Sequence, residues 1–182
     1  MSSTLASAAD ILDNSGYLSA GNIGDARTLS FDAAATWRLS EGIDLSGGVT
    51  LNQAWITNLP LSTIIVEKGR LPNIPDMNAR AALAYTAPPQ ARWPLRVAST
   101  FRYVGRSRLG IGPLLDRRQG GYAEFDIEAS LKFRNGDIFF KVANLLDGGG
   151  NRFALGSITQ FATRDQYVPQ VPRAFTIGLR IR

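Results

Sequence analysis

Cysteine and histidine are both missing from the 182 residues of this chain. Without cysteine there is no disulfide and no thiolate metal site, and without histidine the commonest general base and metal ligand are absent. We therefore expect no metal site and no cofactor. Glu124 and Glu128 share one strand face, but paired carboxylates without a histidine or another cleft-forming partner make a poor hydrolase site. The composition predicts a protein that is not an enzyme.

Long apolar runs are also missing. No stretch of about 18 apolar residues occurs, so no transmembrane helix is predicted. The net charge of +5 arises from 20 Lys and Arg against 15 Asp and Glu. These basic residues are spread along the chain and do not cluster with aromatic platforms, which argues against a nucleic-acid partner.

The sequence instead contains a repeated alternation of apolar and polar side chains. Within residues 121–134, Phe125 and Leu131 point one way while Glu128 and Lys132 point the other. A period of two residues predicts a β-strand with one dry face and one wet face. About seven such strands are expected, at 27–39, 43–56, 78–86, 92–104, 121–134, 137–147 and 173–182.

The connections between these strands alternate in length. Short links are expected at Ser40–Gly42, at Ala87–Ala91 and at the turn Asn135-Gly136, whereas long links are expected at 57–77, 105–120 and 148–172. All short links then fall at one end of the sheet and all long links at the other. Outer-membrane β-barrels have this asymmetry, with tight periplasmic turns and long extracellular loops.

Strand length and aromatic placement also fit a bilayer. About 11 residues at roughly 3.3 Å each, tilted near 45°, rise about 25 Å, which is the height of the apolar band of a membrane barrel. The large aromatic residues are expected in two belts: Trp37, Tyr85, Trp93 and Phe133 beside the short links, and Trp55, Phe101, Tyr103 and Phe125 toward the long ones. The predicted fold is all-β, an antiparallel transmembrane β-barrel segment whose apolar face contacts outer-membrane lipid.

The first part of the chain lacks this strong alternation. Residues 1–26 are expected to form an N-terminal, extracellular segment, and residues 27–182 to form the barrel portion. Apolar residues behind Ser3 predict a short helix over Ser2–Asn14. The segment Tyr17–Ala20 is too short to supply an eighth strand.

Two sets of charged residues are candidates for function. On the wet faces of two neighbouring strands, arginines and carboxylates are expected to pair across the strands and hold the wall or contact a body inside the barrel. This ladder consists of Arg96, Arg102, Glu124, Asp126 and Glu128. The long loops carry a second set, which would attract an anionic ferric chelate, bind lipopolysaccharide phosphate, or simply be solvated. These loop residues are Arg106, Arg108, Arg117, Arg118, Arg152 and Arg164.

Several short motifs resemble one known family, the TonB-dependent outer-membrane receptors, over the last part of their barrel. The matching pieces are GDAR at 24–27, LPNIP at 71–75, YVGRS at 103–107, GGY at 120–122, NLLD at 144–147 and PRAF at 172–175. Each motif is weak alone, but their order and spacing from Gly16 to Arg182 are specific. The resemblance implies a barrel of about 22 strands closed by a plug domain. It further implies uptake of a scarce nutrient, typically a ferric siderophore, driven by the TonB complex in the outer membrane of a Gram-negative bacterium.

Seven strands are only part of such a barrel. An open sheet in lipid leaves two unpaired edges, so we expect the chain to be a C-terminal fragment, a truncated reading frame, or one part of a split receptor. Two other classes stay open. One is a small structural or adhesion-type outer-membrane barrel, which needs an eighth strand from the N-terminal residues. The other is a soluble carbohydrate-binding β-sandwich.

Overall fold

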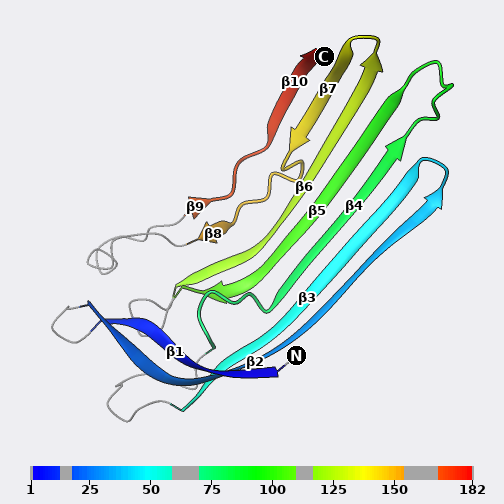
Figure 1. Ribbon diagram of the computed structural model, residues 1–182. Coiled ribbons are helices and arrows are strands. Elements are labelled where there is room, and N and C mark those ends of the chain that lie inside the picture. The colour runs from blue at the N-terminus through cyan, green and yellow to red at the C-terminus, as the bar shows by residue number, and fades with distance from the viewer. Residues whose placement is uncertain (1, 13–17, 59–69, 110–116, 154–167, 182) are drawn as a thin grey trace.

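The computed structural model describes residues 2–12, 18–58, 70–109, 117–153 and 168–181. These residues form one antiparallel sheet of ten strands (Figure 1). The strands are β1 (Ser2–Leu12), β2 (Leu18–Ser40), β3 (Ile43–Asn58), β4 (Met77–Thr86), β5 (Leu95–Arg108), β6 (Arg118–Phe133), β7 (Gly136–Ala143), β8 (Asn151–Phe153), β9 (Val168–Pro169) and β10 (Ala174–Ile181). Within these ranges, no helix is long and apolar enough to cross a membrane.

The strand order is β1-β2-β3-β4-β5-β6-β7-β10, and the short strand β8 pairs with β6 and β9. Each long strand therefore neighbours the next one in sequence, as in an up-and-down barrel wall. The sheet does not close within the described residues, because β1 and β10 are its two edges. All seven alternating stretches predicted from the sequence are strands, β2 to β7 and β10, and the predicted all-β antiparallel fold is confirmed.

The prediction for the N-terminal residues was wrong. The stretch Ser2–Leu12 is not a helix but the strand β1, and it pairs with the first half of β2 from Ser2↔Leu29 to Leu12↔Leu18. The strand β2 is longer than expected, because it begins at Leu18 and not at Arg27. Pairing between the two segments satisfies backbone groups along both, which outweighs the weak helix signal. The sheet path thus has an eighth strand that the sequence did not predict.

Two other strand boundaries differ from expectation for identifiable reasons. The strand β5 begins at Leu95 and not at Arg92, since Pro94 has no N–H to give to a ladder. The strand β7 ends at Ala143 and not at Asp147, because Asn144 takes a positive φ of 48° that breaks the extended backbone. The backbone N–H of Asn144 donates to the Asp126 side-chain carboxylate at 2.8 Å and not to a backbone carbonyl of a neighbouring strand.

The short links lie together at one end of the sheet, as Figure 1 shows. Glu41 and Gly42 connect β2 to β3, with Gly42 at a φ of 81°. The turn between β6 and β7 consists of Arg134 and Asn135, so the predicted turn Asn135-Gly136 was one residue out. Gly136 serves another purpose: a Cβ there would lie 2.0 Å from the carbonyl oxygen of Arg180 in β10.

At the opposite end, part of the expected long loop belongs to the sheet. The segment Arg70–Asp76 continues the line of β4 between β3 and β5. Leu71 N–H donates to the Ala54 carbonyl at 3.0 Å on one side, and Asn73 N–H donates to the Arg108 carbonyl at 2.7 Å on the other. The sheet therefore extends well beyond the height expected for the strands alone.

The two faces of the sheet differ in chemistry, and we name them for it. The apolar face carries the odd-numbered residues of β2 from residue 25 onward and of β3 to β6, the even-numbered residues of β7 and the odd-numbered residues of β10. The polar face carries the alternate residues. Large apolar side chains are exposed, with Ile177 and Ile181 at 74% and 75% of their full accessibility. The buried apolar residues are few and mostly small: Ala26, Ala54, Ile56, Tyr122 and Val142.

This arrangement excludes the β-sandwich for the described residues and agrees with the first of the two predicted aromatic belts. The described residues form a single layer, so no second sheet covers the apolar face as a β-sandwich requires. Beside the short links, Trp37, Tyr85, Trp93 and Phe133 are all exposed, Trp93 at 62%, in agreement with the predicted belt. Trp55, Phe101, Tyr103 and Phe125, expected in the second belt, are only partly exposed. A contiguous exposed apolar surface of this extent is the mark of a face that meets lipid or another protein.

Candidate functional site on the polar face

Charged side chains form a band across β5 and β6 on the polar face. Arg102 lies opposite Glu124 in the register, and the two form an ion pair. Both belong to the ladder that the sequence predicted. Their pairing follows from strand geometry, because directly opposed residues on one face bring their Cβ atoms within about 5 Å.

The other ladder residues find different partners. Asp126 lies opposite Thr100 and accepts the backbone N–H of Asn144. Glu128 lies opposite Ala98, and Arg96 lies opposite Ser130, so Arg96 does not face a carboxylate. The ladder is therefore not a row of matched pairs between β5 and β6.

Glu128 points away from β5, toward the β10 edge of the sheet, and joins a cluster around Arg180 of β10 on the same polar face. The Arg180 guanidinium lies 3.0 Å from the Glu128 carboxylate and 3.0 Å from the Asp137 carboxylate. It also stacks over the Phe139 ring at 4.2 Å. Gly178 makes room for this ring, since a Cβ there would lie 2.4 Å from it. The cluster links three neighbouring strands, β6, β7 and β10, on the polar face, which suits a structural role.

Two shallow hollows lie beside Arg80 and Arg102, each with a volume of about 590 Å³. The hollow nearer the short links is lined by Thr36, Ser46, Ala82, Thr100 and Asp126 among others, and the hollow nearer the long loops by Asp32, Gly48, Thr50, Asn78 and Val104 among others. Most of these side chains are small. Because the surrounding side chains are small, Arg80 and Arg102 are exposed on the polar face.

Arg80 was not among the candidate site residues predicted from the sequence. Arg80 is exposed and lies directly opposite Arg102 on β5 and opposite Gly48 on β3. The available signal was local: Arg80 is the only charged residue in a run of alanine and other uncharged residues, Met77–Thr86. A single charged residue among uncharged ones on a strand is a candidate for a specific interaction.

Most of the arginines expected in the long loops are in fact on strands. Arg106 and Arg108 are in β5, Arg118 is in β6 opposite Arg108, and Arg152 is in β8. All four are exposed, as is Arg117, the residue before β6. The loop placement was wrong because β5 and β6 run further than their alternation indicated, and because the short strand β8 lies within the link expected at 148–172. Arg164 lies outside the described residues.

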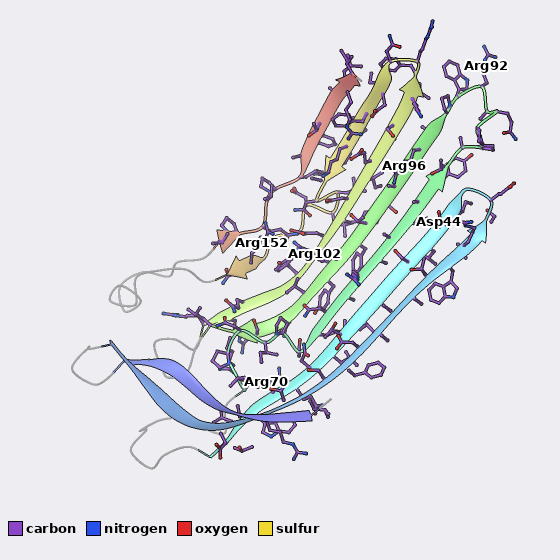
Figure 2. All side chains as sticks on the ribbon, in the orientation of Figure 1. Asp44, Arg70, Arg92, Arg96, Arg102 and Arg152 are labelled. Atoms are coloured by element: carbon purple, nitrogen blue, oxygen red, sulfur yellow. The ribbon has the colours of Figure 1, made fainter. Side chains whose placement is uncertain are left out.

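We call Arg106, Arg108, Arg117, Arg118 and Arg152 the rim arginines. Figure 2 shows Arg152 on β8 toward the long-loop end, while Arg92 marks the short-link end; Arg96 and Arg102 lie between them on β5. Nearby, Arg70 forms an ion pair with Asp76 at 3.6 Å. The rim arginines thus give the long-loop end of the sheet a concentration of positive charge, which is suited to anions.

A single antiparallel sheet with an exposed apolar face, an aromatic belt and a polar inner face is the wall of a transmembrane β-barrel. Residues 4–145 match the family model described as TonB dependent receptor-like, beta-barrel. The chain belongs to this family of TonB-dependent receptors. No curated protein sequence is similar enough to count as a relative.

Solved structures share this fold at low sequence identity. The ferric-catecholate import receptor Fiu from E. coli K12 is 19% identical with a TM-score of 0.71, over 99% of this chain and 24% of Fiu. The ferric yersiniabactin uptake receptor FyuA from Yersinia pestis is 18% identical with a TM-score of 0.71, over 90% of this chain and 24% of FyuA. The copper transporter OprC is 19% identical with a TM-score of 0.62, over 93% and 25% of the two chains.

This chain therefore spans about a quarter of the length of the receptors that it resembles. TonB-dependent receptors are transporters of the Gram-negative outer membrane that work with TonB and contain a plug. The predicted family and the predicted barrel architecture are both confirmed at this level.

Proposed function

We propose that this chain forms part of the barrel wall of an outer-membrane transporter that imports an anionic ferric chelate of the siderophore class. The transporter resides in the outer membrane of a Gram-negative bacterium, takes its energy from the TonB complex and performs no covalent chemistry. The apolar face contacts lipid and the polar face lines the interior. Other parts of the same receptor, further strands and the plug, complete the barrel at the edges β1 and β10.

The orientation follows from the connections. In membrane barrels the short turns lie on the periplasmic side and the long loops outside the cell. The rim arginines then face the medium at the mouth of the barrel. The strand β1 and the start of β2, which belong to residues 1–26, lie on that same extracellular side, above the bilayer. Arginine clusters bind carboxylate and catecholate oxygens well, because a guanidinium donates several hydrogen bonds in a fixed plane.

The observation that carries the proposal is this concentration of exposed arginine at the long-loop end of a TonB-dependent receptor barrel. Several structures of the same fold are named for ferric siderophores. The likeness to a copper transporter makes copper import the second candidate. This part of the wall offers few of the side chains that copper prefers, because it has no histidine, no cysteine and only two methionines.

The proposal is tested by binding to the complete receptor. In a variant with Arg106, Arg118 and Arg152 all changed to Gln, affinity for a ferric triscatecholate, which is anionic, is expected to fall roughly tenfold or more. Affinity for a neutral ferric trihydroxamate is expected to stay the same. The matched control changes Arg92 and Arg134, at the short-link end, to Gln. An equal loss for both complexes, or no loss for the anionic one, would contradict the proposal.

A further inference from the structure

The guanidinium of Arg80 lies on the polar face with no ion-pair partner among the described residues. A Cβ at Gly48 would lie 3.2 Å from Arg80 Nε and 3.5 Å from the Ala34 Cβ. The Arg80 side chain therefore reaches across β3 over the bare backbone of Gly48, toward Ala34 on β2. Glycine at this position gives the guanidinium the space to lie there.

No neighbouring carboxylate of the described residues forms an ion pair with Arg80. Arg102, directly opposite in the register, carries the same charge, and like charges in this position repel. The nearest carboxylate across β5, Glu124, is engaged by Arg102. On β2 and β3, the Asp32 carboxylate accepts the Thr50 hydroxyl at 2.6 Å. Asp32 and Asp126, which also line the two hollows, keep their charge but are held by neutral donors, the Thr50 hydroxyl and the Asn144 N–H. The Arg80 guanidinium therefore stays free to bind an anionic group.

The position of Arg80 relates it to the rim arginines. The register between β5 and β6 runs without a shift from Leu95 to Arg108, so Arg102 and Arg106 share the polar face. They are four residues apart, which is about 13 Å along the strand. The hollow lined by Gly48, Thr50 and Asn78 lies on the long-loop side of Arg80, between Arg80 and the rim arginines.

We propose that Arg80 is a second anion-binding position on the wall of the transport path, one step below the rim arginines. The inference rests on the proposed function and specifies where an anionic substrate group binds after it leaves the rim. The hollow beside Arg80 admits the chelate close to the wall, and the free guanidinium receives a carboxylate or catecholate oxygen. Pores that pass anions are lined by arginine or lysine for the same electrostatic reason.

The test measures the local potential beside Arg80 and does not depend on the identity of the ligand. This chain has no cysteine, so Ala34→Cys introduces a single reporter thiol into it, in the hollows that Arg80 borders. In the complete receptor, the thiol is reacted with a negatively charged and a positively charged methanethiosulfonate. The ratio of the two rate constants, anionic over cationic, reports the potential at the thiol.

Arg80→Gln is expected to lower this ratio about fivefold, since removing a unit charge roughly 7 Å away changes the two rates in opposite directions. Arg80→Lys, which keeps the charge, is expected to preserve the ratio. Arg92→Gln at the short-link end is the control and leaves it unchanged. Heat-modifiable mobility on gels confirms that each variant is folded.

Two results would overturn the inference. An unchanged ratio in Arg80→Gln would mean that the guanidinium does not set the potential there. Failure of the thiol to react with either reagent would mean that another segment of the receptor covers Arg80. Neither result bears on rim binding of ferric chelates, so the two proposals fail separately.

Discussion

Replacing Leu83 by arginine is expected to lower the free energy of unfolding of the receptor by about 1 to 3 kcal/mol. Leu83 lies on the apolar face of β4, two residues before Tyr85 of the aromatic belt, and opposite Leu45 on one side and Ser99 on the other. An arginine there places a guanidinium in hydrocarbon, between the bilayer centre and the interface at the short-link end. Urea titration of the complete receptor in lipid vesicles measures the difference.

The matched control is the next residue, Ala82→Arg. Ala82 has the same depth but lies on the polar face, opposite Ser46 and Thr100. We expect this change to cost less than about 1 kcal/mol, because the new guanidinium remains hydrated. A soluble β-sheet packed on both faces would suffer from both substitutions, so similar losses at 82 and 83 would count against the assignment of the faces.

Gly136→Ala is expected to destabilise the receptor by about 1 to 3 kcal/mol through steric overlap. The added Cβ would lie 2.0 Å from the carbonyl oxygen of Arg180, a backbone atom that cannot rotate away. To accommodate it, β10 must move from β7 where the pairing Ile181↔Gly136 begins. That movement also disturbs Arg180, which holds Glu128 and Asp137. The measurement is again urea-induced unfolding in vesicles.

Gly149→Ala provides the comparison for this effect. A Cβ at Gly149 would meet no atom within 4 Å, and its φ is not positive. Its substitution is expected to change the unfolding free energy by no more than about 0.5 kcal/mol. If Gly136→Ala were equally neutral, the close approach of β10 to β7 at this point would be wrong.

The sequence predicted the wall of the sheet because the relevant signal is local. In β6, apolar and polar residues alternate from Tyr122 to Phe133, and the side-chain period of two then assigns each of these residues to a face without knowledge of its neighbours. The pair Arg102 and Glu124 was also foreseeable, since both residues have even numbers on strands that are adjacent in sequence and therefore fall on the same face of the sheet.

Long-range features were not predictable in the same way. The strand β1 lacks clear alternation, and its conformation is set by pairing with β2. The end of β7 depends on the Asp126 carboxylate, 18 residues away in sequence, which accepts the Asn144 N–H. Likewise the partner of Glu128 is Arg180, 52 residues away, on a strand that returns after β8 and β9. Local pattern carries no information about such contacts.

Only part of the candidate site was predicted, because the rest depends on contacts between strands. Arginine at 106, 108, 118 and 152 was recognised as a charged set, but its place on strands was not. The extra length of β5 and β6 comes with the non-alternating glycines Gly105, Gly120 and Gly121, and β8, which carries Arg152, is only three residues long. Gly120 and Gly121 have φ values of 74° and 71°, which few other residues adopt. Arg80 was missed although it is the only charged residue of β4, because its neighbours across the sheet, Gly48 on β3 and Arg102 on β5, are known only from the structure.

The most direct test of the face assignment uses spin labels at Leu131 and at its neighbour Ser130 in the complete receptor, embedded in native-like lipid. The residues opposite them on β5 are Leu95 and Arg96. We predict that the label at Leu131 is relaxed mainly by oxygen dissolved in the lipid, and that the label at Ser130 is relaxed mainly by a water-soluble nickel chelate. The opposite result, with the nickel chelate reaching Leu131 and oxygen dominating at Ser130, would contradict the assignment of the apolar face to lipid.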